Sequence, residues 1–257
     1  MTTIAHLSDL HFGTVDEAML EPLRAALHSA KPQLLAISGD LTQRAKIKEF
    51  QAARNFLDSL PFPRLVVPGN HDVPIYGRLV RNALARYKRL ITANLDPHFE
   101  DGTVSVVGVN TARAFAFKNG RISHEQIETV RHKFDSCPDG VCKILVVHHP
   151  LDVPRAWKKA PEATRARLAF EQWFDCGVDV ILAGHEHRAH ATNEAERLRI
   201  GTHSAIMVQA GTAISTRLRG EANSFNLLHI DGAAIVVERK TWSGKSFDTT
   251  HKDRFER

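Results

Sequence analysis

Five short segments rich in aspartate, asparagine and histidine stand out, because each of them follows a short apolar run. These segments are Asp9-Leu10-His11, Gly39-Asp40, Gly69-Asn70-His71-Asp72, His148-His149-Pro150 and Gly184-His185-Glu186-His187. Their side chains supply carboxylate and amide oxygens and imidazole nitrogens but no thiolate, a ligand set that suits divalent manganese, iron, zinc or cobalt. The fifteen histidines of the chain do not form one run, so an affinity tag does not account for them.

Each segment has an ordinary structural explanation when it is taken alone. An Asp-x-His triplet is more often a cap or a turn, a Gly-Asp pair is usually a turn, and His148 alone could be a hydrogen-bonded core histidine. Gly-Asn-His-Asp is harder to explain, because four polar or flexible residues after a buried strand make a poor core. The structural explanation would have to hold at all five places, so the set as a whole favours a metal site.

The apolar runs are short, rich in β-branched residues and bounded by glycine, proline or aspartate, which is typical of buried strands. We expect strands over residues 3–7, 33–37, 64–67, 104–109, 143–147 and 178–182. Amphipathic stretches predict helices over residues 16–30, 46–59, 77–91, 123–135 and 162–175, with Gly177 capping the last one. This alternation indicates an α/β fold with a largely parallel sheet, and functional groups gather at the carboxyl ends of such strands.

The last third of the chain predicts strands without a convincing helix. Strand-like runs cover residues 205–210, 224–230 and 233–238, with a turn at Asp231-Gly232. Because no linker separates them, we expect one domain over residues 1–257. It would contain a ligand-bearing βα part over about 1–190, a mainly β part over about 204–242 that forms a second sheet, and a polar, loosely held tail after residue 243.

Composition and charge limit the class of protein. The chain has 257 residues, of which 43% are hydrophobic and 25% charged, as in an ordinary globular protein. It has no run near the ~18 apolar residues of a membrane-spanning helix, no secretory signal and three cysteines that cannot all pair, so we expect a cytoplasmic protein without membrane contact. The net charge of +5 is scattered, which favours a solvated surface over nucleic-acid binding. The oligomeric state, a homo-oligomer included, stays open.

The order D-x-H, G-D, G-N-H-D, H and G-H-x-H over residues 9–187 resembles the calcineurin-like metallophosphoesterase superfamily. Gly-Asp-Leu-Thr at residues 39–42 and His-His-Pro at residues 148–150 are similar to its bacterial branch of class III cyclic nucleotide and glycerophosphodiester phosphodiesterases. The resemblance implies a two-layer β-sandwich of mixed sheets flanked by helices. It also implies an enzyme, a metal-dependent phosphoric ester hydrolase with two divalent metal ions at the strand ends.

The resemblance also assigns roles to residues. Seven residues would hold the metal ions: Asp9, His11 and His187 the first, Asn70, His148 and His185 the second, and Asp40 as a bridge. His148 is preferred to His149 by family analogy, and neighbouring side chains on a strand point to opposite faces. His71 would face the phosphate and the leaving group as a catalytic residue, and Asp72 would orient it. Two metal ions hold a phosphate and a bridging hydroxide for in-line attack on phosphodiester bonds.

Further side chains are candidates for substrate contact. Besides Asn70 and His71, the guanidinium groups of Arg113, Arg217 or Arg219 would suit a phosphate, although an exposed surface position is the commoner fate of an arginine. A site that prefers monoesters commonly needs such extra cations. The residues beside the expected ligands are mostly neutral or apolar, and they would suit the second substituent of a diester; examples are Leu10, Phe12, Leu41 and Val73.

The implied substrate is therefore a small phosphodiester, such as a nucleotide, a glycerophosphodiester or an aryl diester. A phosphomonoesterase or a nuclease of the same superfamily is the alternative within enzymes. The positive net charge supports a nuclease, and the short chain without a long extension argues against it. A scaffold that has lost the metal ions is the alternative from another class, and the complete set of ligand positions argues against it.

Overall fold

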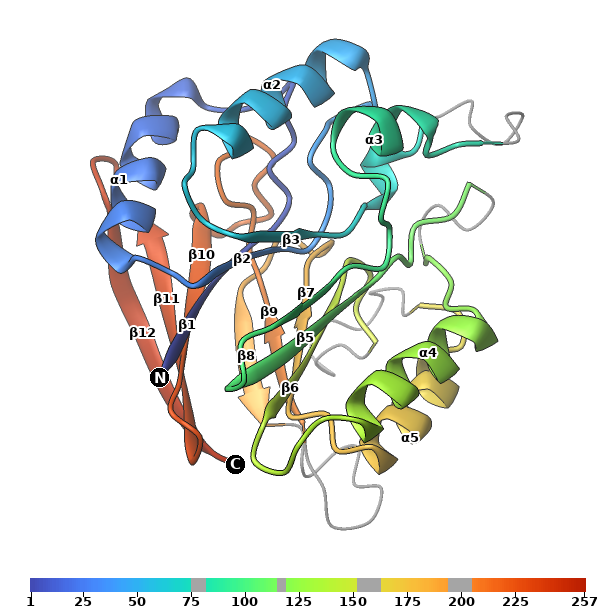
Figure 1. Ribbon diagram of the computed structural model, residues 1–257. Coiled ribbons are helices and arrows are strands. Elements are labelled where there is room, and N and C mark those ends of the chain that lie inside the picture. The colour runs from blue at the N-terminus through green and yellow to red at the C-terminus, as the bar shows by residue number, and fades with distance from the viewer. Residues whose placement is uncertain (75–81, 115–118, 152–162, 194–204) are drawn as a thin grey trace.

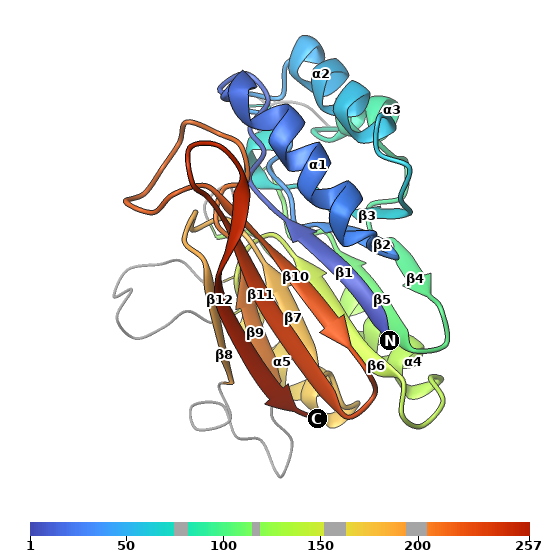
Figure 2. The same cartoon turned by 90° about the vertical axis from the view of Figure 1, so that its left-hand side faces the viewer.

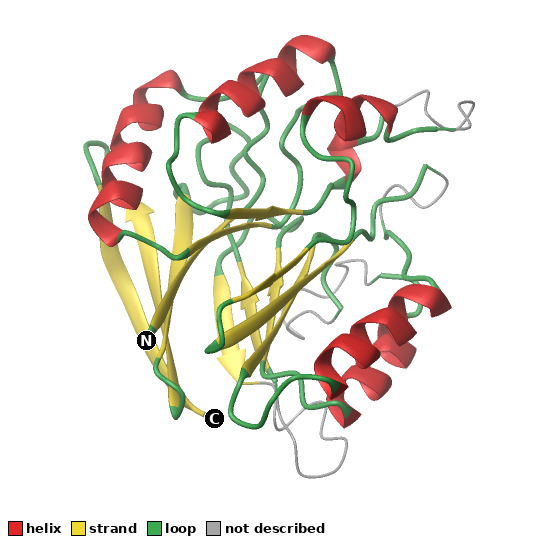
Figure 3. Cartoon of the chain, in the orientation of Figure 1, coloured by secondary structure: helices red, strands yellow, loops and turns green. Residues whose placement is uncertain are grey.

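The computed structural model describes residues 1–74, 82–114, 119–151, 163–193 and 205–257. Two six-stranded sheets pack face to face, and helices cover the outer side of each sheet (Figure 1 and Figure 3). Both sheets are mixed, with parallel strands in the part that follows the predicted βα alternation. The predicted two-layer α/β sandwich is confirmed.

The first sheet combines the start and the end of the chain. Its order is β12-β11-β10-β1-β2-β3, in which β1, β2 and β3 are parallel and β10, β11 and β12 are antiparallel. The strands are β1 (Thr2–Leu7), β2 (Leu34–Ile37), β3 (Arg64–Val66), β10 (Ser224–Ile230), β11 (Ala234–Trp242) and β12 (Phe247–Glu256).

The second sheet contains the middle of the chain in the order β4-β5-β6-β7-β9-β8. Its four central strands are parallel, and β4 and β8 pair antiparallel at the two edges. The strands are β4 (His98–Glu100), β5 (Val104–Val109), β6 (Cys142–Val147), β7 (Val180–Ala183), β8 (His190–Asn193) and β9 (Ile206–Gln209).

The helices fall close to the predicted ranges. The first sheet carries α1 (Leu20–Ala30), α2 (Ile47–Asp58) and α3 (Ala85–Leu90), and the second carries α4 (His124–Asp135) and α5 (Ala166–Asp175) (Figure 1). The chain enters α1 through a short 3-10 turn at Glu17–Met19. The start of the helix expected over residues 77–91 lies outside the described residues, as does residue 162. Gly177 follows α5 with a positive φ of 76°, as expected of a residue that ends a helix.

Three apolar cores follow from the alternation of side chains along the strands. On β1, Ile4 packs with residues of both sheets, while Ala5 and Leu7 pack with the first three helices. On β6, Ile144 likewise belongs to the core between the sheets, and Leu145 packs with α4 and α5. This period of two is what a strand buried on both faces requires. The sheets are therefore held rigidly together, and their strand ends form a fixed platform.

The last third of the chain does not form a sheet of its own, so that prediction is wrong. β9 enters the second sheet between β7 and β8, whereas β10 pairs with β1 and brings β11 and β12 into the first sheet (Figure 2). The expected loose tail is also wrong, because β12 pairs with β11 along its length. Arg257 then binds the Asp179 carboxylate at 2.9 Å and the carbonyl oxygen of Gly140 at 2.8 Å. The sequence did not predict β12 as a strand, because its side chains are mostly exposed and therefore polar.

The three cysteines, Cys137, Cys142 and Cys176, are free thiols. Within the described residues, no helix combines the length and the apolar character that crossing a membrane requires.

The burial of Phe247 at the start of β12 gives a first prediction. Phe247 is only 6% exposed and its ring lies 5.5 Å from that of Phe225 and 5.3 Å from that of Trp242. We expect Phe247→Ala to lower the free energy of unfolding by about 3–5 kcal/mol, because a buried ring is replaced by a cavity. Asp253→Asn, on an exposed position of the same strand, should change it by no more than about 0.5 kcal/mol. Urea denaturation measures the free energy of unfolding of both variants. Equal values for the two variants would indicate that β12 is a loosely held tail.

Candidate metal centre

The predicted ligands meet where strands of both sheets end. Beyond β1 and β2 the two chain segments continue side by side, since Asp9 N–H donates to Gly39 O at 3.1 Å and His11 N–H to Asp40 O at 2.9 Å. Beyond β6 and β7, Gly184 N–H donates to His148 O at 3.1 Å. Backbone hydrogen bonds therefore continue for a few residues beyond the ends of these strands, and they fix the polar segments relative to one another.

One group of four buried side chains comes from both sheets: Asp9, His11, Asp40 and His187. Their ligand atoms all lie within 4.8 Å of one another. His11 Nε2 lies 3.1 Å from His187 Nε2, 3.6 Å from Asp9 Oδ1 and 3.7 Å from Asp40 Oδ2. These are the side chains expected around the first metal ion, with Asp40.

In His11 and His187 a hydrogen bond from the Nδ1 atom sets the tautomer of the imidazole. His11 Nδ1 lies 3.3 Å from Thr42 O, and His187 Nδ1 lies 2.7 Å from Arg217 O. A carbonyl oxygen only accepts, so each Nδ1 donates and each Nε2 of a neutral ring keeps its lone pair. Both Nε2 atoms lie beside the buried Asp9 Oδ1 atom, that of His187 at 3.1 Å and that of His11 at 3.6 Å. Burial opposes a charge on His187, but Asp9 raises the pKa of this imidazole above its ordinary value. Imidazole nitrogens and carboxylate oxygens gathered at one buried point are ligands for a cation, and this donor set fits a divalent metal ion.

The second group of ligands surrounds the Asn70 amide oxygen. Asn70 Oδ1 lies 2.9 Å from both His148 Nε2 and His185 Nδ1, and these two nitrogens are 3.3 Å apart. His148 Nδ1 donates to Ser38 O at 2.7 Å, so its Nε2 also keeps a lone pair. These are the three side chains expected around the second metal ion.

Asp40 lies between the two groups. Its Oδ2 atom faces His11 of the first group, while its Oδ1 atom lies 3.4 Å from His148 Nε2 of the second. The same Oδ1 atom accepts a hydrogen bond from the backbone N–H of His71 at 2.8 Å. One carboxylate therefore presents an oxygen to each group, which is the arrangement that a bridging ligand needs.

His149 lies closer to the site than strand alternation suggests. It belongs to a group with His148 and His185, and its ring centre is 4.9 Å and 4.8 Å from theirs. β6 ends at Val147, so the period of two no longer holds at these two histidines. His149 Nδ1 is paired with Thr111 Oγ1 at 2.8 Å, whereas Asn70 is within hydrogen-bond distance of His148. Because of this contact with Asn70, His148 stays our predicted ligand.

The electrostatics of the site keep most of its imidazoles neutral. Burial lowers the pKa of His148 to about 4 and that of His185 to about 3. Burial alone would raise the pKa of Asp9, but His187 and His11 hold it well below its usual range. Burial and the charge of Asp9 raise the pKa of Asp40 well above its usual range. Two buried carboxylates so close together are both ionised only when a positive charge lies beside them.

The backbone is strained at the ligands. Eight described residues other than glycine have positive φ, and five of them are predicted ligands: Asp9, His11, Asp40, His185 and His187. Such conformations cost about 1–3 kcal/mol each and cluster at functional sites. Sharp turns at the strand ends are what aim side chains of consecutive segments at one point.

Small residues next to the ligands allow this close packing. Asp9 Oδ2 accepts hydrogen bonds from Ser8 Oγ at 2.6 Å and from His185 N–H at 3.0 Å, which leaves Oδ1 for the first group. A Cβ atom at Gly184 would overlap Ser8 Oγ, and one at Gly69 would overlap the Asp40 carboxylate. The glycines of the G-N-H-D and G-H-x-H motifs are therefore needed for contact between segments. The sequence did not predict this role of Ser8, and its position next to Asp9 in the chain is the one signal that could have suggested it.

His71 is oriented differently from the prediction. Its Nδ1 donates to Gln43 O at 2.8 Å, and its Nε2 accepts from Arg217 Nη1 at 2.9 Å. Burial and the neighbouring positive charges lower the pKa of His71 to about 3, so the ring is neutral. Gln43 and not Asp72 therefore orients this imidazole, and its lone pair faces a guanidinium group. Its ring stands edge-on to that of His11, at 4.9 Å between centres.

Asp72 instead joins two of the polar segments. Its carboxylate accepts hydrogen bonds from the backbone N–H groups of Leu41, Thr42 and Gly69 at 3.2, 2.9 and 2.9 Å, and from the Thr42 hydroxyl at 2.9 Å. Burial raises the pKa of Asp72 to about 6, and these hydrogen bonds oppose the rise. Asp72, the expected catalytic partner of His71, therefore has a structural role, because its carboxylate holds the segments of Asp40 and Asn70 together. We call this arrangement the Asp72 clamp.

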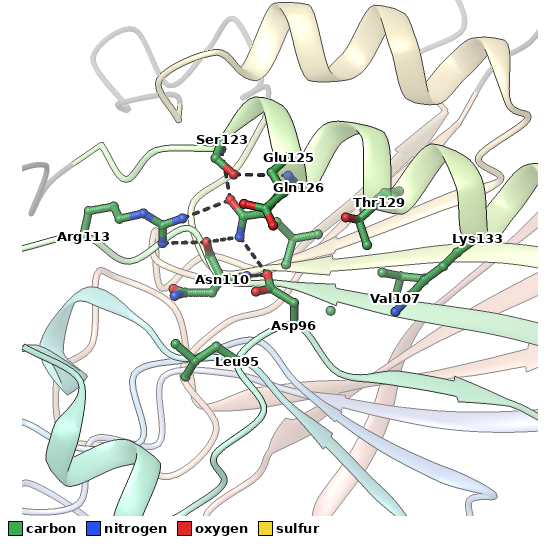
Figure 4. A pocket seen from close by; sticks show the side chains of 13 residues that line it. Leu95, Asp96, Val107, Asn110, Arg113, Ser123, Glu125, Gln126, Thr129 and Lys133 are labelled. Atoms are coloured by element: carbon green, nitrogen blue, oxygen red, sulfur yellow. Dashed lines mark hydrogen bonds between the residues drawn. The ribbon is translucent and has the colours of Figure 1, made fainter. Parts of the chain in front are cut away.

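The three candidate arginines have different surroundings. Arg113 donates to the carbonyl oxygens of Asn110 and Ala112 and to Gln126 Oε1, all at 2.9 Å, at one end of a pocket of about 320 Å³ beside α4 (Figure 4). These bonds give it a structural role. Arg219 pairs with Glu186 at 3.0 Å. Arg217 alone of the three contacts a predicted catalytic residue, His71.

The apolar neighbours of the ligands do not line a substrate site, which corrects another expectation. Leu10, Phe12, Leu41 and Val73 are buried in the core between the first sheet and its helices. They support the ligand segments from behind. The diester preference therefore does not follow from these residues.

This fold and this site define the class of the protein as a metallophosphoesterase, in which strand ends of two stacked sheets carry clustered aspartate, asparagine and histidine side chains. The chain belongs to the calcineurin-like phosphoesterases, whose family model matches residues 2–189. The resemblance seen in the motifs is thus confirmed.

Known relatives agree with this assignment. A probable cyclic nucleotide phosphodiesterase of Synechococcus sp. is 25% identical over 210 residues, which cover 73% of this chain and 74% of that protein. The 3',5'-cyclic adenosine monophosphate phosphodiesterase CpdA of Escherichia coli is 24% identical over 204 residues, 72% of this chain and 69% of that one. The crystal structure of a dimetal phosphatase from Danio rerio has a TM-score of 0.72 over 99% of this chain and 98% of its own, at 11% identity, and shares the fold.

The Asp72 clamp gives a second prediction. Asp72→Ala leaves three buried N–H groups without an acceptor, and we expect it to lower the free energy of unfolding by about 3–5 kcal/mol. Asp72→Asn keeps one acceptor oxygen of the same shape and should lose less. Urea denaturation of the two variants and the wild type measures this. Unchanged stability of Asp72→Ala would contradict the structural role.

Proposed function

We propose that the protein is a phosphodiesterase that uses two divalent metal ions. The observation that carries the proposal is the position of Asp40, whose two carboxylate oxygens face two separate groups of buried electron-pair donors. Asp9, His11 and His187 would hold one ion, and Asn70, His148 and His185 the other. Such ions, when bound, polarise the phosphate oxygens and activate water at neutral pH.

The residues of the chain prepare this centre for a phosphate. Backbone carbonyl oxygens fix the tautomers of His11, His148 and His187, so their ligand nitrogens need no reorganisation. Because the other ligands are neutral, Asp9 and Asp40 cancel only part of the positive charge of the ions, which favours an anionic ester. In this proposal Asn70 and His71 border the phosphate, and Arg217 adds a cation next to His71.

The names of the relatives support a diester as substrate. The relatives from Synechococcus and Escherichia coli are named as cyclic nucleotide phosphodiesterases, and the aligned regions cover about three quarters of this chain. We propose a small diester such as a nucleotide or an aryl diester, with manganese, iron, zinc or cobalt in the site. Cytoplasmic localisation stays a prediction.

A third prediction tests the two ions. Elemental analysis after incubation with excess Mn²⁺ and desalting should find about two ions per chain, because two groups of ligands share one bridge. Asp40→Ala should lose most of both ions, since each group loses an oxygen. Glu125→Ala, which removes an exposed carboxylate outside both groups, should bind like the wild type. A metal-free wild type, or an Asp40→Ala variant with both ions, would refute the bridged centre.

A fourth prediction tests the reaction. With the same metal and pH, kcat/KM for bis-p-nitrophenyl phosphate should exceed that for p-nitrophenyl phosphate, because the relatives that support the proposal are named as phosphodiesterases. Asp40→Ala prepared in the same way controls for contaminating phosphatases and should hydrolyse neither compound. A monoester preference with every metal tested would overturn the diesterase and leave a metal-dependent phosphoesterase.

A further inference from the structure

The Arg217 guanidinium lies against the site but does not belong to either ligand group. Its Nη1 donates to His71 Nε2 at 2.9 Å and to Gln43 Oε1 at 3.3 Å. His71 in turn stands edge-on to His11, and its backbone N–H binds Asp40. The guanidinium is therefore separated from the predicted ligands by a single imidazole ring.

The backbone of Arg217 is fixed to the same site. Its carbonyl oxygen accepts the Nδ1 proton of His187 at 2.7 Å, and its N–H donates to Ser215 Oγ at 3.1 Å. Ser215 is fully buried, and its carbonyl oxygen accepts a hydrogen bond from Asn223 at 2.8 Å. Thr216 N–H donates to Thr14 O at 2.9 Å. Arg217 is thus presented by a rigid segment that also orients a predicted ligand.

The charge of Arg217 is not neutralised by an acidic partner. The part of the chain that the structure describes contains no ion pair of Arg217 with a carboxylate, whereas Arg219, two residues away, pairs with Glu186 at 3.0 Å. Among the described residues the guanidinium group of Arg217 makes its hydrogen bonds through Nη1 alone, and its Nε and Nη2 donors make none. A fixed, half-buried guanidinium with open donors is suited to a phosphate oxygen.

We propose that Arg217 makes the site selective for charge, by donating to a non-bridging oxygen of phosphate and so favouring a dianionic phosphomonoester relative to a monoanionic diester. Nη1 keeps its contact with His71, and the open donors bind the ester. This inference rests on the proposed function. It adds that the site also binds the monoester that is formed when a diester is hydrolysed. Replacing Arg217 should therefore increase the preference of the site for diesters over monoesters.

The physical reason is the difference of one charge. A phosphomonoester carries close to two negative charges above its second pKa of about 6, and a phosphodiester carries one. The attraction of a cation is proportional to the charge of the ester, so an added guanidinium strengthens the binding of the dianion more than that of the monoanion. One charge-assisted hydrogen bond is worth about 10- to 100-fold in affinity. The effect of Arg217 should therefore appear in the ratio of the two ligands.

The test is binding, measured by calorimetry on the Mn²⁺-loaded protein at about pH 7.5, with methyl phosphate and dimethyl phosphate as matched probes. Arg217→Gln should weaken methyl phosphate about 10- to 100-fold and dimethyl phosphate distinctly less. Arg217→Lys keeps the charge and should recover part of the loss. Arg219→Gln removes a neighbouring charge that is already paired, and it should leave the ratio of the two affinities unchanged.

Kinetics provide the second measurement. In Arg217→Gln the ratio of kcat/KM for bis-p-nitrophenyl phosphate to that for p-nitrophenyl phosphate should rise, chiefly through a higher KM for the monoester. Equal losses for both probes, or no loss, would overturn the role of Arg217. If the wild type hydrolysed neither ester, the proposed function would fail, whereas the titration with methyl phosphates would still decide what Arg217 does. Thermal unfolding of each variant verifies that it is folded.

Discussion

The crowding of electron-pair donors around Asp40 is the constraint on which the site depends. Two buried carboxylates, the Asn70 amide oxygen and several imidazole lone pairs approach one another to about 3–4 Å. In an ordinary core this arrangement would be repulsive, and a polar network of this kind would contain shared protons. Here backbone carbonyl oxygens accept the Nδ1 protons of His11, His148 and His187, so the Nε2 atoms of these rings face the cluster and are available to a metal ion.

The packing of the two sheets holds these donors close together. Strand ends of both sheets contribute ligands, so the donors converge from two sides, and the core between the sheets holds them in place. Positive φ angles at Asp9, Asp40 and His185 turn the side chains inward, while Gly69 and Gly184 let the segments touch. Asp72 joins the segments after β2 and β3. Strain at the ligands is thus supported by apolar packing and by hydrogen bonds behind them.

Arg217 and Arg219 show how one loop gives two similar side chains different roles. Arg219 is paired with Glu186 and contributes little net charge, whereas Arg217 is held by neutral acceptors and keeps its charge. Arg217 O also orients the ligand His187. The segment after β9 therefore completes the first ligand group with its backbone and changes the charge of the site with a side chain.

The sequence by itself determined the βα alternation and the family, and it predicted the ligand groups, because polar motifs directly after buried strands gather at the carboxyl ends of those strands. It did not determine which sheet the last strands join, since β10 pairs with β1 across more than two hundred residues. It also missed β12, whose exposed side chains resemble a polar tail. The roles of Asp72, His149 and Arg217 were decided only by the tertiary structure, because each depends on which donor or acceptor a distant segment places beside it.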